Sequence, residues 1–156
     1  MRLPFLLGIG FGLLDLLVIE FILPHPPHSS LPPYTQPFPY SLFLYFSGAL
    51  EIEVFYRLIP ITLVMLVFNK YWGGRYFIPA FWVIALLTSL REPLEQWPDG
   101  PSWFVAYSLI TGIAMNFLQA WYFRKEGFMA SLIIRWGHYL IWHILNGIVI
   151  QFLIMH

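Results

Sequence analysis

The chain has 156 residues, of which 59% are hydrophobic and 10% are charged, with a formal net charge of zero, a mean hydropathy of +0.70 and no cysteine. Because soluble domains carry about 25% charged residues, this composition predicts an integral membrane protein. The balanced charges give no nucleic-acid footprint, and the lack of cysteine excludes disulfides and thiolate chemistry. We expect a single all-α membrane domain over residues 1–156, since helices satisfy their own backbone groups in lipid.

Five segments are long or apolar enough to cross a hydrocarbon core of about 30 Å, given a helical rise of about 1.5 Å per residue. They cover residues 3–23, 41–68, 77–91, 102–123 and 128–154, so the sequence predicts a multi-pass bundle of about five transmembrane helices. Lysine and arginine occur before the first segment, between the second and third, and between the fourth and fifth, and are absent from the other two loops. Since cytoplasmic loops are enriched in basic residues, we expect a cytoplasmic N-terminus.

The first segment is expected to remain as a helix rather than to be cleaved as a signal peptide. It carries Asp15 and Glu20 and ends without a small-residue cleavage pattern. Gly8 and Gly12 are spaced for close approach of another helix, with Asp15 one turn later.

A proline-rich outer loop follows at residues 24–40, and its prolines predict an extended, non-helical chain. His25 and His28 lie in this loop. Two histidines in a stiff segment without other ligands nearby do not make a metal site, and we therefore predict none.

The second segment contains the charged residues that are least expected at membrane depth, Glu51, Glu53 and Arg57. Ionisable groups inside a membrane face protein or a polar cavity, which makes this stretch the first candidate for a functional site. Glu53 and Arg57 are one helical turn apart and are predicted to form an ion pair. Pro60 removes the hydrogen bond to the carbonyl of Tyr56, so that carbonyl should face the ion pair.

The fifth segment contains a second group of polar residues: Arg135, His138, His143 and Asn146. At about 100° per residue they occupy an arc of about 140°, which must face protein rather than lipid. Counting residues from the outer end of each segment places Glu53 and His143 at the same depth. The two segments are therefore predicted to present polar groups to each other.

Four short runs carry a resemblance to a known family. Residues 52–57 read Ile-Glu-Val-Phe-Tyr-Arg, residues 87–91 read Leu-Thr-Ser-Leu-Arg, residues 122–127 read Tyr-Phe-Arg-Lys-Glu-Gly, and residues 142–147 read Trp-His-Ile-Leu-Asn-Gly. In this order, over about residues 41–150, the chain resembles the CPBP family of CAAX-protease and bacteriocin-processing membrane proteins, also called Abi-like. The family pattern is Glu-Glu-x-x-x-Arg, then Phe-x-x-x-His, then His-x-x-x-Asn on successive helices.

The resemblance implies an intramembrane peptidase ancestry with degenerate motifs. In the family, the first Glu and the second-motif His are understood to activate water, and Ile52 and Arg91 occupy those positions here. Neither side chain can act as a general base. We therefore expect a non-catalytic binding module or a small accessory subunit of a larger membrane complex. Its expected partners are the lipid bilayer and either other subunits or a lipid-like ligand, with no nucleic acid and no cofactor that the sequence identifies.

The alternative is an active peptidase that cleaves prenylated or other membrane-anchored peptides. Glu53 would then act as the base, Arg57 would orient it, and His143 would stabilise the oxyanion. Four further polar residues are candidates for contact with a substrate or ligand: Glu51, Arg91, His138 and Asn146.

Overall fold

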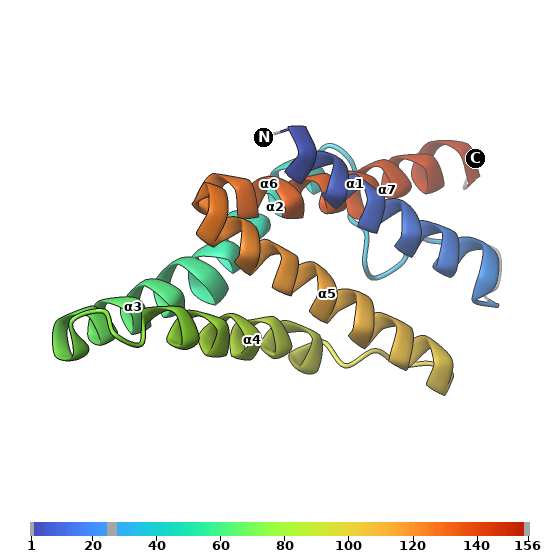
Figure 1. Cartoon of the computed structure of the whole chain (residues 1–156). Coiled ribbons are helices and arrows are strands. Elements are labelled where there is room, and N and C mark those ends of the chain that lie inside the picture. The colour runs from blue at the N-terminus through green and yellow to red at the C-terminus, as the bar shows by residue number, and fades with distance from the viewer. Residues whose placement is uncertain (1, 25–27, 155–156) are drawn as a thin grey trace. The chain divides into compact units, whose positions relative to one another are not determined.

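The computed structural model describes residues 2–24 and 28–154, and all regular structure in these ranges is helical (Figure 1). Five helical runs result, built from α-helices and short π-helical segments labelled η. They are α1 (Arg2–Leu17) with η1 (Val18–Ile22); α2 (Tyr40–Glu53), η2 (Val54–Leu58) and α3 (Ile59–Trp72); α4 (Phe77–Glu95); α5 (Ser102–Glu126); and α6 (Phe128–Tyr139), η3 (Leu140–Leu145), α7 (Asn146–Val149) and η4 (Ile150–Ile154).

Four of these runs in the described chain are long and apolar enough to cross a membrane: Arg2–Ile22, Phe77–Glu95, Ser102–Glu126 and Phe128–Ile154. The remaining run, residues 40–72, contains the buried charges discussed above. The predicted class, an all-α multi-pass membrane bundle, is confirmed.

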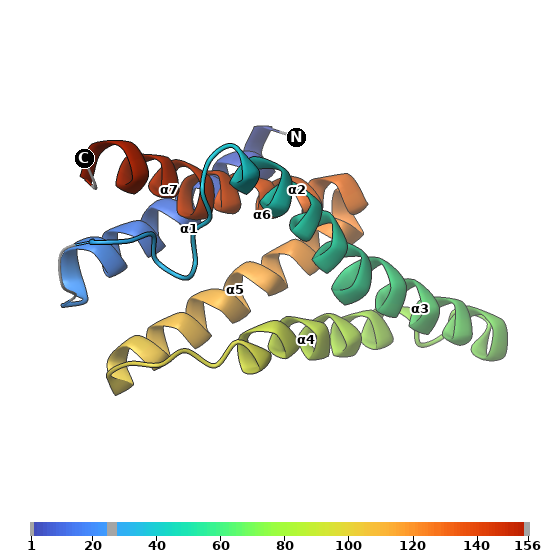
Figure 2. The same ribbon diagram turned by 180° about the vertical axis from the view of Figure 1, so that it is seen from behind.

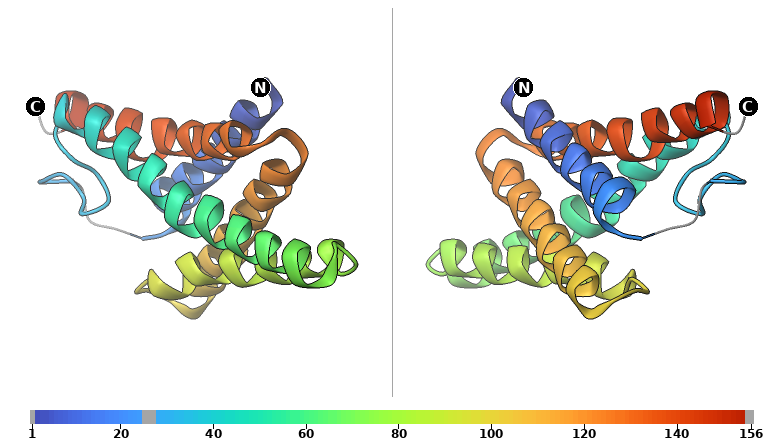
Figure 3. Two further views of the ribbon diagram at one scale, coloured as in Figure 1. Left: turned by 90° about the vertical axis from the view of Figure 1, so that its left-hand side faces the viewer. Right: turned by 90° about the vertical axis from the view of Figure 1, so that its right-hand side faces the viewer.

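Contacts divide the chain into two compact units. Unit 1 comprises residues 1–50 and 132–156, and unit 2 comprises residues 51–131. In unit 1, α1 packs against η3. In unit 2, α4 packs along both α3 and α5, as the views from behind and from the sides show (Figures 2 and 3).

Glycines bring the backbones of unit 1 into direct contact. A Cβ atom at Gly8 would lie 2.0 Å from the carbonyl oxygen of Ile134, and one at Gly137 would lie 2.6 Å from that of Phe5. A Cβ at Gly12 would meet the carbonyl oxygen of His138 at 2.9 Å. The close approach predicted from Gly8 and Gly12 is therefore confirmed, and α6 supplies the matching glycine.

A small apolar core fixes the helices of unit 2. Ile61 of α3, Phe81 and Ala85 of α4, and Ala120 of α5 form a buried cluster. Gly73 ends α3 in the left-handed conformation (φ 55°), which permits the tight turn into α4.

The predicted end of the third segment at residue 91 was wrong, because α4 continues to Glu95. Pro93 lies inside this helix and is buried, and a Cβ at Gly112 of α5 would meet its ring at 3.1 Å. Proline removes one backbone hydrogen bond from the helix, and the ring of Pro93 packs against α5 at this point.

Candidate functional site

Arg57 is the centre of the polar cluster of unit 2, and its side chain is fully buried. It lies in η2, where its guanidinium Nη1 donates to the carbonyls of Tyr56 at 3.1 Å and Thr88 at 3.3 Å. The other terminal nitrogen, Nη2, donates to the carbonyl of Asn116 at 3.0 Å, to the Asn116 side-chain oxygen, and to Gln119 Oε1 at 3.5 Å. Arg57 thus connects η2 to both α4 and α5.

The Tyr56 carbonyl had been predicted to face this cluster because Pro60 removes its helical donor. The hydrogen bond from Arg57 confirms that prediction. The π-helical turn from Val54 to Leu58 ends two residues before Pro60, and Tyr56 lies within this turn.

Glu53, the candidate base, is also fully buried. Ser131 on α6 donates its hydroxyl proton to Glu53 Oε2. This hydrogen bond satisfies one oxygen of the buried carboxylate. The direct ion pair between Glu53 and Arg57 stays a prediction, and both residues lie in unit 2 with further electrostatic partners.

Glu51 and Arg91 lie away from this buried cluster, since both side chains are exposed. The Arg91 Nε atom donates to Glu95 at 2.8 Å, and its guanidinium lies 4.3 Å from the centre of the Tyr56 ring. Tyr56 donates its hydroxyl proton to the same glutamate. Arg91 therefore belongs to a surface cluster at the end of α4 rather than to a water-activating site.

Sequence reasoning missed the neutral acceptors around Arg57 and a second buried carboxylate in unit 2. Glu92 is 7% exposed and lies one turn after Thr88 on α4. Asn116 and Gln119 are three residues apart on α5, which places them on one face. That spacing was a usable signal, whereas nothing in the run around Glu92 distinguishes it from a surface residue near a helix end.

In unit 1, His138 pairs with Asp15 rather than with a group on its own helix. His138 Nε2 lies 2.7 Å from Asp15 Oδ2, and both side chains are largely buried. The pair occurs one turn beyond Gly12, where a Cβ atom would meet the carbonyl oxygen of His138 itself. Sequence reasoning had recognised both residues without joining them, because it compared His138 only with the second segment.

In unit 1, the ring of His143 contacts α2 and the proline-rich loop, which is predicted to lie on the outer side. Its Nδ1 atom donates to the carbonyl of Tyr34 at 2.5 Å, so that nitrogen carries the proton. Its ring stacks on Tyr45 at 4.3 Å between centres, and Tyr45 donates to the same carbonyl at 3.0 Å. These contacts fix the orientation of the His143 ring.

The predicted arc of about 140° in the fifth segment was wrong, because the angle around the helix axis from His138 to His143 differs from that of an α-helix. Residues 140–145 are π-helical, so five residues make about one turn there, and the rings of His138 and His143 lie 6.2 Å apart between centres. The 100° step used for prediction holds only for an α-helix.

Asn146 completes a second cluster of unit 1 around Glu20. This carboxylate lies 3.0 Å from His28 Nε2 and accepts from Tyr34 OH at 3.4 Å and Asn146 Nδ2 at 3.2 Å. Burial and the nearby Glu20 carboxylate raise the pKa of the Tyr34 hydroxyl above its ordinary value, so Tyr34 remains a proton donor at neutral pH. Tyr34 also stacks on Trp142, which fixes the loop to the fifth run.

Within residues 2–24 and 28–154, no group of three or more histidine, aspartate or glutamate side chains is arranged to hold a metal ion. His25 lies outside the described residues, and His28 contacts Glu20. The proposed joint site of Glu53, Arg57 and His143 contains residues of both units, and its assembly stays a prediction.

The helices and their buried polar clusters define a multi-pass membrane protein with ionisable groups inside its spans. No family model, curated protein or solved structure matches the chain. The resemblance to the CPBP family therefore depends on the residues quoted above.

Proposed function

We propose that this chain is a non-catalytic membrane module with a degenerate CPBP-like core, acting as a small accessory subunit of a larger membrane complex. The observation that carries the proposal is the enclosure of Arg57. Its fully buried guanidinium has protein acceptors on η2, α4 and α5. A side chain whose two terminal nitrogens are used in this way holds helices in register.

The position aligned with the family's second-motif histidine supports the same conclusion. Arg91 at that position is exposed and bound to Glu95, and a guanidinium does not accept a proton at neutral pH. General acid–base catalysis supplies about 10²–10⁴-fold in rate, so its loss alone would leave little peptidase activity.

The orientation in the membrane is part of this proposal. The basic residues Lys70, Arg75, Arg124 and Lys125 lie at the ends of α3, α4 and α5 that we assign to the cytoplasmic side. The N-terminus is then cytoplasmic.

An intramembrane peptidase is the second candidate, and one observation favours it. Glu92 is a second buried carboxylate in unit 2, on the helix that would carry the family's second motif. Two buried carboxylates are a common arrangement for general acid–base chemistry.

The deciding experiment is purification from native membranes in mild detergent, followed by a turnover assay on a panel of lipidated peptides. We expect co-purification with other membrane proteins in fixed ratio and no cleavage above that of a Glu53→Gln, Glu92→Gln double variant. Cleavage by the unaltered chain that Glu53→Gln or Glu92→Gln abolishes would overturn the non-catalytic proposal. Purification as a lone chain would overturn the accessory-subunit role.

A further inference from the structure

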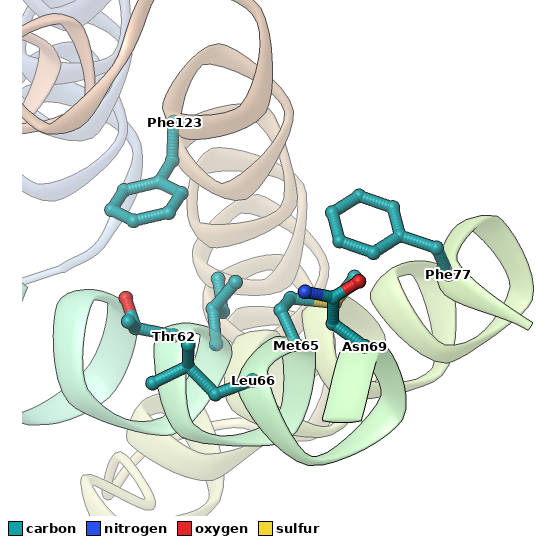
Figure 4. A pocket seen from close by; sticks show the side chains of 7 residues that line it. Thr62, Met65, Leu66, Asn69, Phe77 and Phe123 are labelled. Carbon is teal, nitrogen blue, oxygen red and sulfur yellow. The ribbon is translucent and has the colours of Figure 1, made fainter. Parts of the chain in front are cut away.

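A groove on unit 2 lies apart from the charged cluster. It has a volume of about 360 Å³ and is lined by residues of α3, the start of α4 and the end of α5: Ile61, Thr62, Met65, Leu66, Asn69, Phe77 and Phe123. Figure 4 shows the rings of Phe77 and Phe123 above the row of side chains from α3. The lining is apolar except for Thr62 and Asn69.

The dimensions of this groove suit one hydrocarbon chain. From Ile61 to Asn69 the lining follows α3 for eight residues, or about 12 Å at the helical rise. The volume lies near the lower end of the range of about 300–1,000 Å³ for small-molecule pockets. Two of the three helices that line the groove, α4 and α5, are long and apolar enough to cross a membrane, which brings the groove within reach of acyl chains.

Basic residues flank the groove, with Lys70 and Arg75 next to the end formed by Asn69 and Phe77, and Arg124 next to Phe123, which lies above Thr62 toward the other end (Figure 4). Lys70 directly follows Asn69, Arg75 precedes Phe77 by two residues, and Arg124 directly follows Phe123. All three side chains are exposed, and within the described residues no ion pair to a carboxylate involves them.

Aromatic contacts place Arg124 beside the groove. Its guanidinium lies 5.1 Å from the centre of the Phe81 ring and 5.5 Å from that of Trp82. Phe81 belongs to the apolar cluster of unit 2, against which the groove residues Met65 and Phe123 pack.

Membrane topology alone would require basic residues at this end of the helices, without any bound ligand. It does not require an apolar groove at the same place. Basic sites between transmembrane helices are also where anionic lipid headgroups bind, and arginine matches phosphate in a bidentate geometry.

We propose that the groove, with Lys70 and Arg75 at its Asn69 end, binds an anionic glycerophospholipid. One acyl chain occupies the groove and the phosphate contacts these two basic side chains. This site goes beyond the proposed accessory role and does not rest on it, because lipid binding is measured without a peptide substrate or a partner protein.

The test uses the purified full chain in mild detergent, with phosphatidylglycerol and phosphatidylcholine of identical acyl chains as probes. Native mass spectrometry gives the dissociation constant of each lipid. We expect tighter binding of phosphatidylglycerol, and a loss of about fivefold in its affinity for each basic residue removed in Lys70→Gln and Arg75→Gln, since each such charge contributes about a factor of five. Affinity for phosphatidylcholine, whose choline balances the phosphate charge, should fall by less than that for phosphatidylglycerol in both variants.

Lys125→Gln is the control for loss of a positive charge. Lys125 is an exposed basic residue of the same unit, and its Nζ atom lies 3.6 Å from the carboxylate of Glu126. This variant should retain the affinity of the unaltered chain. Met65→Trp, which fills the groove, should weaken both lipids, and circular dichroism would establish that it folds. Equal affinity for the two lipids in the unaltered chain would overturn the proposal. So would competition by glycerol phosphate as strong as that by phosphatidylglycerol, since the site would then bind the anion without a lipid chain.

Discussion

A buried guanidinium needs acceptors for its donors, and neutral groups supply them at the two terminal nitrogens of Arg57. Three backbone carbonyls and two side-chain amide oxygens surround its terminal nitrogens. Neutral acceptors spread over η2, α4 and α5 make the residue a connection between helices. Its loss should therefore affect the packing of unit 2 as well as any chemistry.

Replacing Arg57 with alanine should strongly destabilise the protein, because it leaves carbonyl and amide acceptors unsatisfied in a buried cluster. Breaking a buried charged interaction typically costs about 3–5 kcal/mol. Glu51→Gln changes an exposed side chain and should stay within about 0.5 kcal/mol. Thermal unfolding in detergent measures both, and equal stability of the two variants would contradict the buried role of Arg57.

At this scale the sequence identified Glu53 and Arg57 as buried charges, but it missed Glu92 and did not show what holds them. The Tyr56 carbonyl could be predicted because Pro60 removes its donor by covalent geometry. The spacing of Asn116 and Gln119 indicates a shared helix face, but it could not predict their partner, because only tertiary contacts select it. Asp15 was predicted as a polar neighbour of a packing face, and its pairing with His138 required knowledge of which helix packs there.

Among the elements, α1 and α6 meet backbone to backbone because both present glycine at their crossing. Backbone contact of this kind replaces side-chain burial as the source of packing energy in membranes, where lipid is as apolar as leucine. The same crossing holds Asp15 against His138 one turn further along α1.

Gly8→Ala should weaken this crossing, since its Cβ would lie 2.0 Å from the carbonyl oxygen of Ile134. Overpacking of this kind costs about 1–3 kcal/mol. Gly10→Ala is the matched control on the same helix, because a Cβ there meets no described atom within 4 Å. It should stabilise α1 by up to about 1 kcal/mol. Unfolding measurements that rank the two variants the other way would exclude the close approach.

The apolar lengths of the helices were sufficient to predict the runs, since hydrocarbon thickness sets their minimum length. The π-helical turns at η2 and η3 were not predictable, because propensity scales describe α-helices and π-turns depend on packing. They change which residues share a face, which explains the wrong angle between His138 and His143.

For the whole molecule, the sequence predicted the class, while the orientation in the membrane and the assembly of the site stay predictions. The grouping of Glu53, Arg57 and His143 depends on depth along two different helices, and equal depth does not determine contact. The predicted orientation depends on charge, since basic residues lie in alternate loops and the intervening loops carry none.

Single-cysteine labelling tests the topology, because the chain has no cysteine and each variant carries one reporter. Ser30 lies in the proline-rich loop and Tyr71 at the end of α3, and both are exposed. Gly73 and Gly74 in the adjacent turn are unsuitable positions, since their positive φ angles would strain any other residue.

With a membrane-impermeant maleimide, Tyr71→Cys should react only from the cytoplasmic side and Ser30→Cys only from the outside, because one helical run separates them. Trp97→Cys, in the loop after α4, should react together with Ser30→Cys. Reaction of Ser30→Cys and Tyr71→Cys from the same side would show that residues 40–72 do not cross the membrane, and the polar cluster of unit 2 would then lie at its surface.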